Sequence, residues 1–79
     1  MKALGIRLLD QICYLEQLNI LSHDERVEYA NLVGLAMTPG YEHYFGILRG
    51  KLEEKANAST GSTADLLENT LAAFEQGTA

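Results

Sequence analysis

The clearest structural signal in this sequence is TPGYEHYFGILRGKLEEKA, which runs from Thr38 to Ala56. Thr38 can cap a helix through its hydroxyl, and Pro39 suits the first helical position because its missing N–H has no helical partner there. Apolar side chains then recur every three or four residues along one side of a helix: Tyr41, Phe45, Leu48, Leu52 and Ala56. The pattern predicts an amphipathic helix over residues 39–56.

Three further segments carry the same periodicity. It predicts helices over residues 2–19, 24–37 and 64–76, and a polar loop over residues 57–62 that we expect to be mobile. We find no run of alternating apolar and polar residues typical of a β-strand. The sequence therefore predicts one all-α domain, residues 1–79, folded as a bundle of three to four helices. The residues expected in its core are Leu8, Ile12, Leu15, Tyr41, Phe45, Leu48, Leu52, Leu71 and Phe74.

The start of the second helix carries a capping box. Ser22 is followed three residues later by Glu25, so the hydroxyl can accept a free N–H of the first turn while the carboxylate reaches back. Ile20 and Leu21, in the turn before it, are expected to point inward. In the first helix, Leu18 extends the apolar stripe and Cys13 widens it.

Composition and charge limit the class of protein. The chain has 79 residues, 47% of them hydrophobic, a net charge of −5 and a single Cys. An acidic surface argues against direct binding of nucleic acid, because such binding depends on Lys and Arg at the phosphates. A single Cys allows no internal disulfide and favours a reducing compartment. No segment approaches the length of about 20 apolar residues that a membrane span needs, so we expect a cytoplasmic protein.

The second predicted helix is apolar on two opposite sides. Val27, Gly34 and Met37 lie on one side, and Tyr29, Leu32 and Ala36 lie on the other. A short chain has few elements to cover both sides, which favours self-association, with a dimer as the preferred state. Tyrosine is common at interfaces because it joins a large apolar body to a polar tip. The residues predicted to form the interface are Tyr29, Leu32, Ala36, Tyr44, Ile47 and Lys51.

Two pairs of small residues stand four apart on helices. Gly46 and Gly50 form one pair, and Ala30 and Gly34 form the other. Glycine in a helix interior lowers helix stability, so such a pair can indicate the close approach of another backbone. The alternative is that the glycines are tolerated on an exposed surface. The sequence leaves both interpretations open.

No set of residues forms a recognisable catalytic or metal-binding signature. His23 precedes Asp24, and His43 follows Glu42, but adjacent helical residues point about 100° apart and cannot act together on one ligand. Cys13 has no cationic neighbour that would activate its thiol. We therefore predict no enzymatic activity, no cofactor and no metal site.

The second and third helices superficially resemble a helix-turn-helix. A recognition helix offers Arg, Lys, Asn or Gln to the bases from its first turns. Here the first turns offer Tyr41, Glu42, His43 and Tyr44, which argues against DNA recognition.

The run Thr38-Pro39-Gly40-Tyr41, followed by a helix that ends in Lys51-Leu52-Glu53-Glu54-Lys55, resembles small helical proteins encoded by tailed phages. The resemblance is one of composition and covers residues 38–55. It implies a virion component or an inhibitor of a host protein.

These observations favour a non-catalytic protein–protein interaction module, such as a small acidic adaptor, inhibitor or assembly component that binds a protein partner. The alternatives are a phage-encoded inhibitor of a host or defence protein, which includes a nucleic-acid mimic, and an oligomer that binds a small ligand between its subunits.

Overall fold

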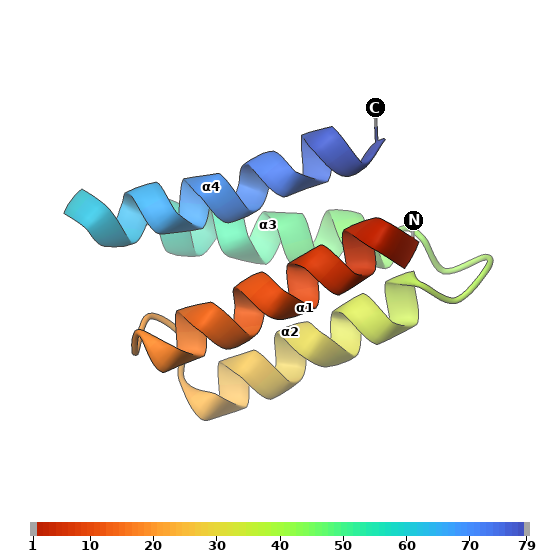
Figure 1. The fold of residues 1–79 in the computed structure, drawn as a ribbon, viewed down its shortest axis with the longest axis horizontal. Helices are drawn as coiled ribbons and strands as arrows, with labels where there is room; N and C mark the ends of the chain where they lie inside the picture. The colour runs from red at the N-terminus through yellow and green to blue at the C-terminus, as the bar shows by residue number, and fades with distance from the viewer. Residues whose placement is uncertain (1, 79) are drawn as a thin grey trace.

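A computed structural model describes the backbone of residues 2–78 and the side chains of residues 3–75. It contains four helices, α1 (Lys2–Gln17), α2 (His23–Ala36), α3 (Tyr44–Asn57) and α4 (Gly61–Thr78), and no strand among the described residues (Figure 1). The predicted all-α helical bundle is confirmed. Within the described part of the chain, no helix combines the length and the hydropathy needed to cross a bilayer.

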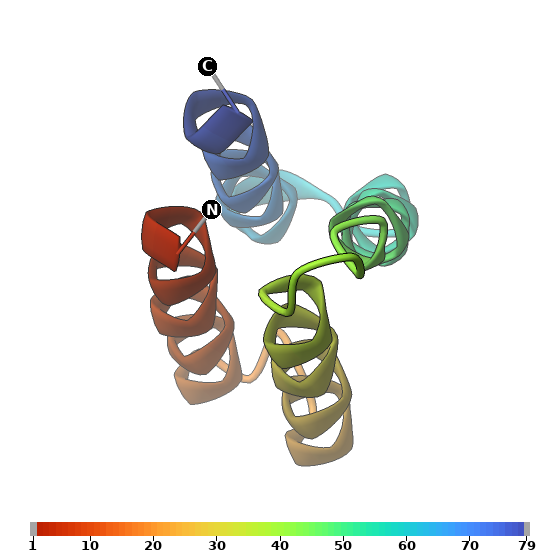
Figure 2. The same cartoon turned by 90° about the vertical axis from the view of Figure 1, so that its right-hand side faces the viewer.

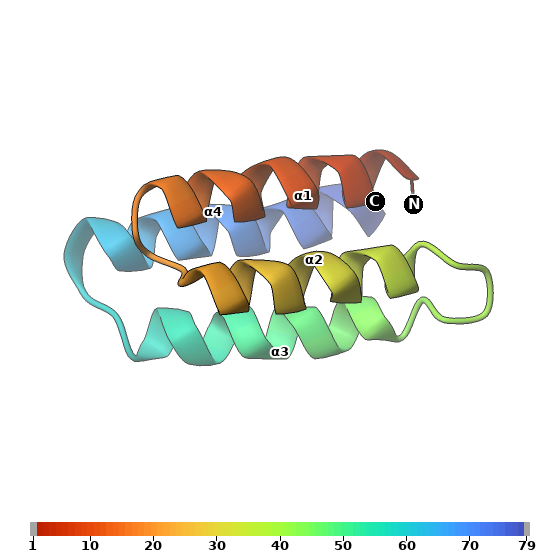
Figure 3. The same cartoon turned by 90° about the horizontal axis from the view of Figure 1, so that it is seen from below.

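The four helices stand at the corners of a bundle, with each helix beside the one that precedes it in the chain (Figure 2). Successive helices run in opposite directions, and α4 closes the bundle by packing against α1. The α2–α3 connection lies at one end, whereas the α1–α2 and α3–α4 connections lie at the other (Figure 3).

One hydrophobic core fills the space between the helices. Phe45 and Phe74 meet edge to face across α3 and α4, with ring centroids 6.5 Å apart. The predicted core is confirmed at seven positions, Leu8, Ile12, Leu15, Phe45, Leu48, Leu52 and Phe74, and Leu71 is half-buried against the same cluster.

The prediction that α3 begins at Pro39 is wrong. The Thr38 hydroxyl donates to the carbonyl of Gly34 at 3.3 Å, so Thr38 closes the end of α2 instead of capping α3. Gly40 has φ +92°, which a right-handed helix cannot contain, and α3 begins only at Tyr44. Tyr41 consequently lies outside the helix and is 49% exposed, not in the core as predicted.

Other helix ends also differ from the prediction. α4 begins at Gly61, three residues before the predicted start, which leaves residues 58–60 as the α3–α4 connection. α1 ends at Gln17 because Asn19 adopts a left-handed conformation, with φ +61°. The N–H of Ile20 donates to the carbonyl of Leu15 and that of Asn19 to Glu16, the bonding pattern of a Schellman motif.

This turn directs Leu21 into the core and leaves Leu18 exposed. Cys13, within α1, is also exposed, so the apolar arc of α1 is narrower than predicted. The capping box at α2 is confirmed: the Ser22 hydroxyl accepts the Glu25 N–H at 3.1 Å, and the Glu25 carboxylate accepts the Ser22 N–H at 2.9 Å.

Gly5 lies where α1 and α2 approach closely. A Cβ atom at Gly5 would stand 2.3 Å from the Met37 Sδ and 2.7 Å from its Cγ, so the glycine makes room for the Met37 side chain. Gly34, Gly46 and Gly50, in contrast, are exposed. A Cβ atom added to any of them would meet no atom within 4 Å other than its chain neighbours and the nearby backbone of its own helix. Within one chain, these three glycines therefore serve no close helix contact.

Candidate functional site

The side of the bundle formed by α2 and α3 has a register that two ion pairs define. The Lys55 ammonium lies 2.9 Å from the Glu25 carboxylate, and the Lys51 ammonium lies 3.4 Å from that of Glu28. Because the helices are antiparallel, one turn further from Glu28 along α2 corresponds to one turn back from Lys51 along α3. That step brings Leu32 level with Ile47, and the next brings Leu35 level with Tyr44.

These four residues, Leu32, Leu35, Tyr44 and Ile47, are named here the α2–α3 patch. Leu35 and Ile47 are 45% and 43% exposed, although both are large and aliphatic. Leu32 and Tyr44 are half-buried and anchor the patch to the core beneath it. The patch therefore presents apolar surface on a rigid base.

Aromatic rings extend the patch toward the α2–α3 connection. The ring of Tyr44 lies 4.5 Å from that of His43 and 6.3 Å from that of Tyr41. The Glu42 carboxylate accepts the Gly40 N–H at 3.0 Å and closes the turn that carries these side chains. The positive φ of Gly40 thus places Tyr41 beside the patch.

Four of the six residues predicted to form an interface, Leu32, Tyr44, Ile47 and Lys51, lie on this side of the bundle. Tyr29 and Ala36 do not: they are 5% and 1% exposed and form part of the core with Val33. The opposite side of α2, which carries Val27 and Gly34, faces away from the core and is exposed to solvent. Leu35 was not predicted, although it follows Leu32 by three residues and shares its side of the helix.

Ion pairs join each helix to the next along the chain. Arg26 binds Glu16 at 2.8 Å between α1 and α2, and Arg49 lies 3.5 Å from Glu75 between α3 and α4. The two lysine pairs join α2 and α3. Between α1 and α4 there is a neutral contact: the buried Thr70 hydroxyl lies 3.5 Å from the Gln11 amide oxygen and donates to the Leu66 carbonyl at 3.0 Å.

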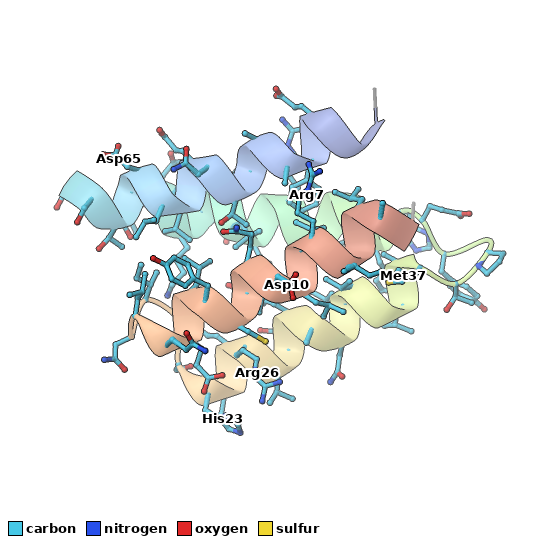
Figure 4. All side chains as sticks on the ribbon, in the orientation of Figure 1. Arg7, Asp10, His23, Arg26, Met37 and Asp65 are labelled. Atoms are coloured by element: carbon cyan, nitrogen blue, oxygen red, sulfur yellow. The ribbon has the colours of Figure 1, made fainter. Side chains whose placement is uncertain are left out.

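The internal ion pairs leave the surplus of acids on the surface. Asp65 projects from α4 away from the bundle (Figure 4). The α2–α3 side carries Lys51 and Lys55, which offset part of its acidic charge. Among the described side chains, six carboxylates form no ion pair: Asp10, Asp24, Glu42, Glu54, Asp65 and Glu68.

Hydrogen bonds lower the pKa values of three carboxyl groups. Those from His23 and Arg26 lower the pKa of Glu16. The Ser22 backbone N–H and the Lys55 ammonium lower the pKa of Glu25. Backbone N–H groups, its own and that of Gly40, lower the pKa of Glu42. All three carboxylates stabilise helix contacts or turns.

Tyr29 has a raised pKa. Burial of the phenol is the main cause, and the carboxylates of Glu25, Glu28 and Glu54 add to it. The group packs in the core between helices and faces no cavity. Its perturbed pKa therefore reflects packing and gives no indication of catalysis.

The histidines and the cysteine do not converge on a site. His23 pairs with Glu16, seven residues earlier on α1, at 3.2 Å, and not with the neighbouring acids considered from the sequence. His43 stacks beside tyrosines, and Cys13 is exposed on α1. The described residues contain no group of three metal-binding side chains and enclose no detectable pocket.

Comparison of this chain with protein-family models, with curated proteins and with solved structures finds no match. The function is therefore argued from the surface of the bundle itself.

We expect Glu25→Ala to destabilise the protein by about 1 kcal/mol at neutral pH, because it removes the side chain that accepts the Ser22 N–H in the capping box. The ion pair between Glu25 and Lys55 is partly exposed to solvent, so its loss adds little to the destabilisation. The lowered pKa of Glu25 means that its stabilisation is complete above the ordinary value of 4.5 and is lost as the pH falls through the folded-state value.

The difference in urea midpoint between the wild type and Glu25→Ala should therefore shrink in acid. Glu68→Ala, which truncates an exposed helical glutamate without an ion pair, is the matched control and should show little difference at either pH. A difference that stays constant from neutral pH to well below 4.5 would contradict the proposed role of Glu25.

Proposed function

We propose that this chain is a protein-binding module of the cytoplasm that uses the α2–α3 patch and performs no chemistry of its own. The exposure of Leu35 and Ile47 at neighbouring levels of two adjacent helices carries the proposal. Single exposed aliphatic residues are common on protein surfaces, whereas contiguous ones indicate contact with another molecule.

The composition around the patch supports a protein partner. Tyrosines at Tyr41 and Tyr44 supply large contact area with few rotatable bonds, and tyrosine is enriched among residues that contribute most to binding. The Glu28–Lys51 pair borders the apolar residues with charge. A central apolar cluster with a charged rim is the usual arrangement of a protein interface.

We expect Ile47→Glu to abolish capture of binding partners from an extract of the source organism. A charge at the centre of an apolar contact weakens binding by about 2 kcal/mol or more, which corresponds to roughly 30-fold in affinity. Captured proteins should be identified by mass spectrometry, with circular dichroism to confirm that the variant is folded.

Ile6→Glu is the matched control, because Ile6 is 51% exposed on α1, away from the patch. It should capture the same proteins as the wild type. The proposal would be overturned if folded Ile47→Glu retained every partner, or if Ile6→Glu lost the same ones.

A further inference from the structure

The charges beside the α2–α3 patch are divided between its two helices. The acids Glu25 and Glu28 are on α2, and the cations Lys55 and Lys51 stand at the same levels on α3. The apolar residues are divided in the same way, with Leu32 and Leu35 on α2 and Tyr44 and Ile47 on α3. On this surface α2 thus contributes two acids and two apolar residues, and α3 contributes two lysines and two apolar residues at the same levels.

We propose that the partner on the α2–α3 patch is a second copy of this chain, related by a two-fold axis that runs along the line between α2 and α3. Rotation about such an axis leaves the position of each residue along the helix direction unchanged and exchanges the positions of α2 and α3. As a result, α2 of each copy lies on α3 of the other. This inference rests on the proposed function, since it names the protein that the patch binds.

In this arrangement Glu28 of each copy faces Lys51 of the other, and Glu25 faces Lys55. Leu35 faces Tyr44, and Leu32 faces Ile47. Each of these four charges therefore meets an opposite charge, and each of the four patch residues meets an apolar one. The surface is complementary to itself only about this axis, because an axis across the helices would place the charged end of one copy on the apolar end of the other.

The size of the surface predicts a weak dimer. A helix of 14 residues is about 21 Å long, and two such helices at the usual spacing present roughly 20 Å of width. The resulting footprint of roughly 400 Å² per copy falls below the roughly 800 Å² per partner of a standard stable interface. Association should therefore depend on concentration, from the micromolar to the near-millimolar range.

The test uses sedimentation velocity on Glu28→Lys, on Lys51→Glu and on their equimolar mixture. Each variant alone places like charges across the interface and should remain at 8.7 kDa where the wild type associates. In the mixture every contact between copies joins opposite charges again, while the contacts within each chain stay repulsive. The mixture should therefore form heterodimers about tenfold or more tighter than either variant alone forms dimers.

Asp65→Lys mixed with Lys51→Glu is the matched control. Glu28→Lys and Asp65→Lys change the net charge equally, from −5 to −5 + 2 = −3, but Asp65 projects away from the patch. This mixture should show no gain over its components. Circular dichroism should show that all variants fold, because Glu28 and Lys51 are a half-exposed pair of small energetic value.

A wild type that stays monomeric from micromolar to near-millimolar concentration would overturn the two-fold dimer. So would a Glu28→Lys and Lys51→Glu mixture that associates no more tightly than either variant alone. The proposed function is separable from this result. It would stand if Ile47→Glu still lost captured partners, and both proposals would fail if Ile47→Glu altered neither capture nor sedimentation.

Discussion

Leu48→Ala is expected to remove a large fraction of the free energy of unfolding of the protein. Leu48 is fully buried on α3, and truncation of a buried leucine in a packed core costs about 3–5 kcal/mol through lost burial and the cavity left behind. The total free energy of unfolding of a domain of this length is roughly 4–12 kcal/mol. Urea unfolding followed by circular dichroism should show a sharply lowered midpoint or no cooperative transition.

Ile47→Ala is the matched control for this prediction. Ile47 precedes Leu48 on the same helix, is 43% exposed, and loses a similar number of carbon atoms on truncation. Its substitution should cost less than about 1 kcal/mol. Equal losses at Ile47 and Leu48 would mean that the side of α3 assigned to the core is wrong.

Gly5→Ala is expected to destabilise the protein by about 1–3 kcal/mol, even though alanine favours a helix by about 1 kcal/mol over glycine. The reason is the Met37 side chain, whose Sδ and Cγ occupy the space that the new methyl group would need. Neither atom is the terminal methyl group of Met37, so a rotation of that methyl group alone would not relieve the clash.

The same substitution should become stabilising in a Met37→Ala background, where the space at Gly5 is free. A double-mutant cycle by urea unfolding measures this change of sign as a coupling energy between the two sites. Gly46→Ala, at an exposed glycine with open space around it, should be stabilising in either background. A destabilisation at Gly5 that persists without Met37 would point to the backbone of α1 as its cause.

The helices and most of the core were predictable because local periodicity determines them. The stripes of α1 and α3 contain only one broad apolar side each, so Leu8 and Leu52 could be placed without knowing their neighbours. The first residue of α3 was not predictable in this way. Thr38 and Pro39 form a good helix start in isolation, and only the left-handed conformation of Gly40 shows that the chain turns there instead.

Which side of α2 faces the core could not be predicted from the sequence, for a different reason. The helix has two apolar sides, and the one that turns inward is decided by its contacts with α1 and α3, which a single segment does not encode. Tyr29 consequently changed from a predicted interface residue to a core residue. The predicted self-association remains a proposal, now argued from Leu35 and Ile47.

The ion pairs between helices were also hidden from the sequence. Glu25 and Lys55 are 30 residues apart, and their pairing depends on the register of two antiparallel helices. Rules for neighbours three or four apart identify only pairs such as Arg49 and Glu53 on one helix. The capping role of Glu25, in contrast, was predictable because it depends on Ser22 three residues earlier.

The order of the helices around the bundle has a consequence for how the chain folds. Three of the four helix contacts join segments that follow one another, and only the contact between α1 and α4 links distant parts of the chain. Contacts of the first kind require short loop closures and form rapidly, whereas the last must bring together Gln11 and Thr70, 59 residues apart. The docking of α4 onto α1 is thus the step with the largest entropic cost, and side chains at that contact should control the folding rate more than those between α2 and α3.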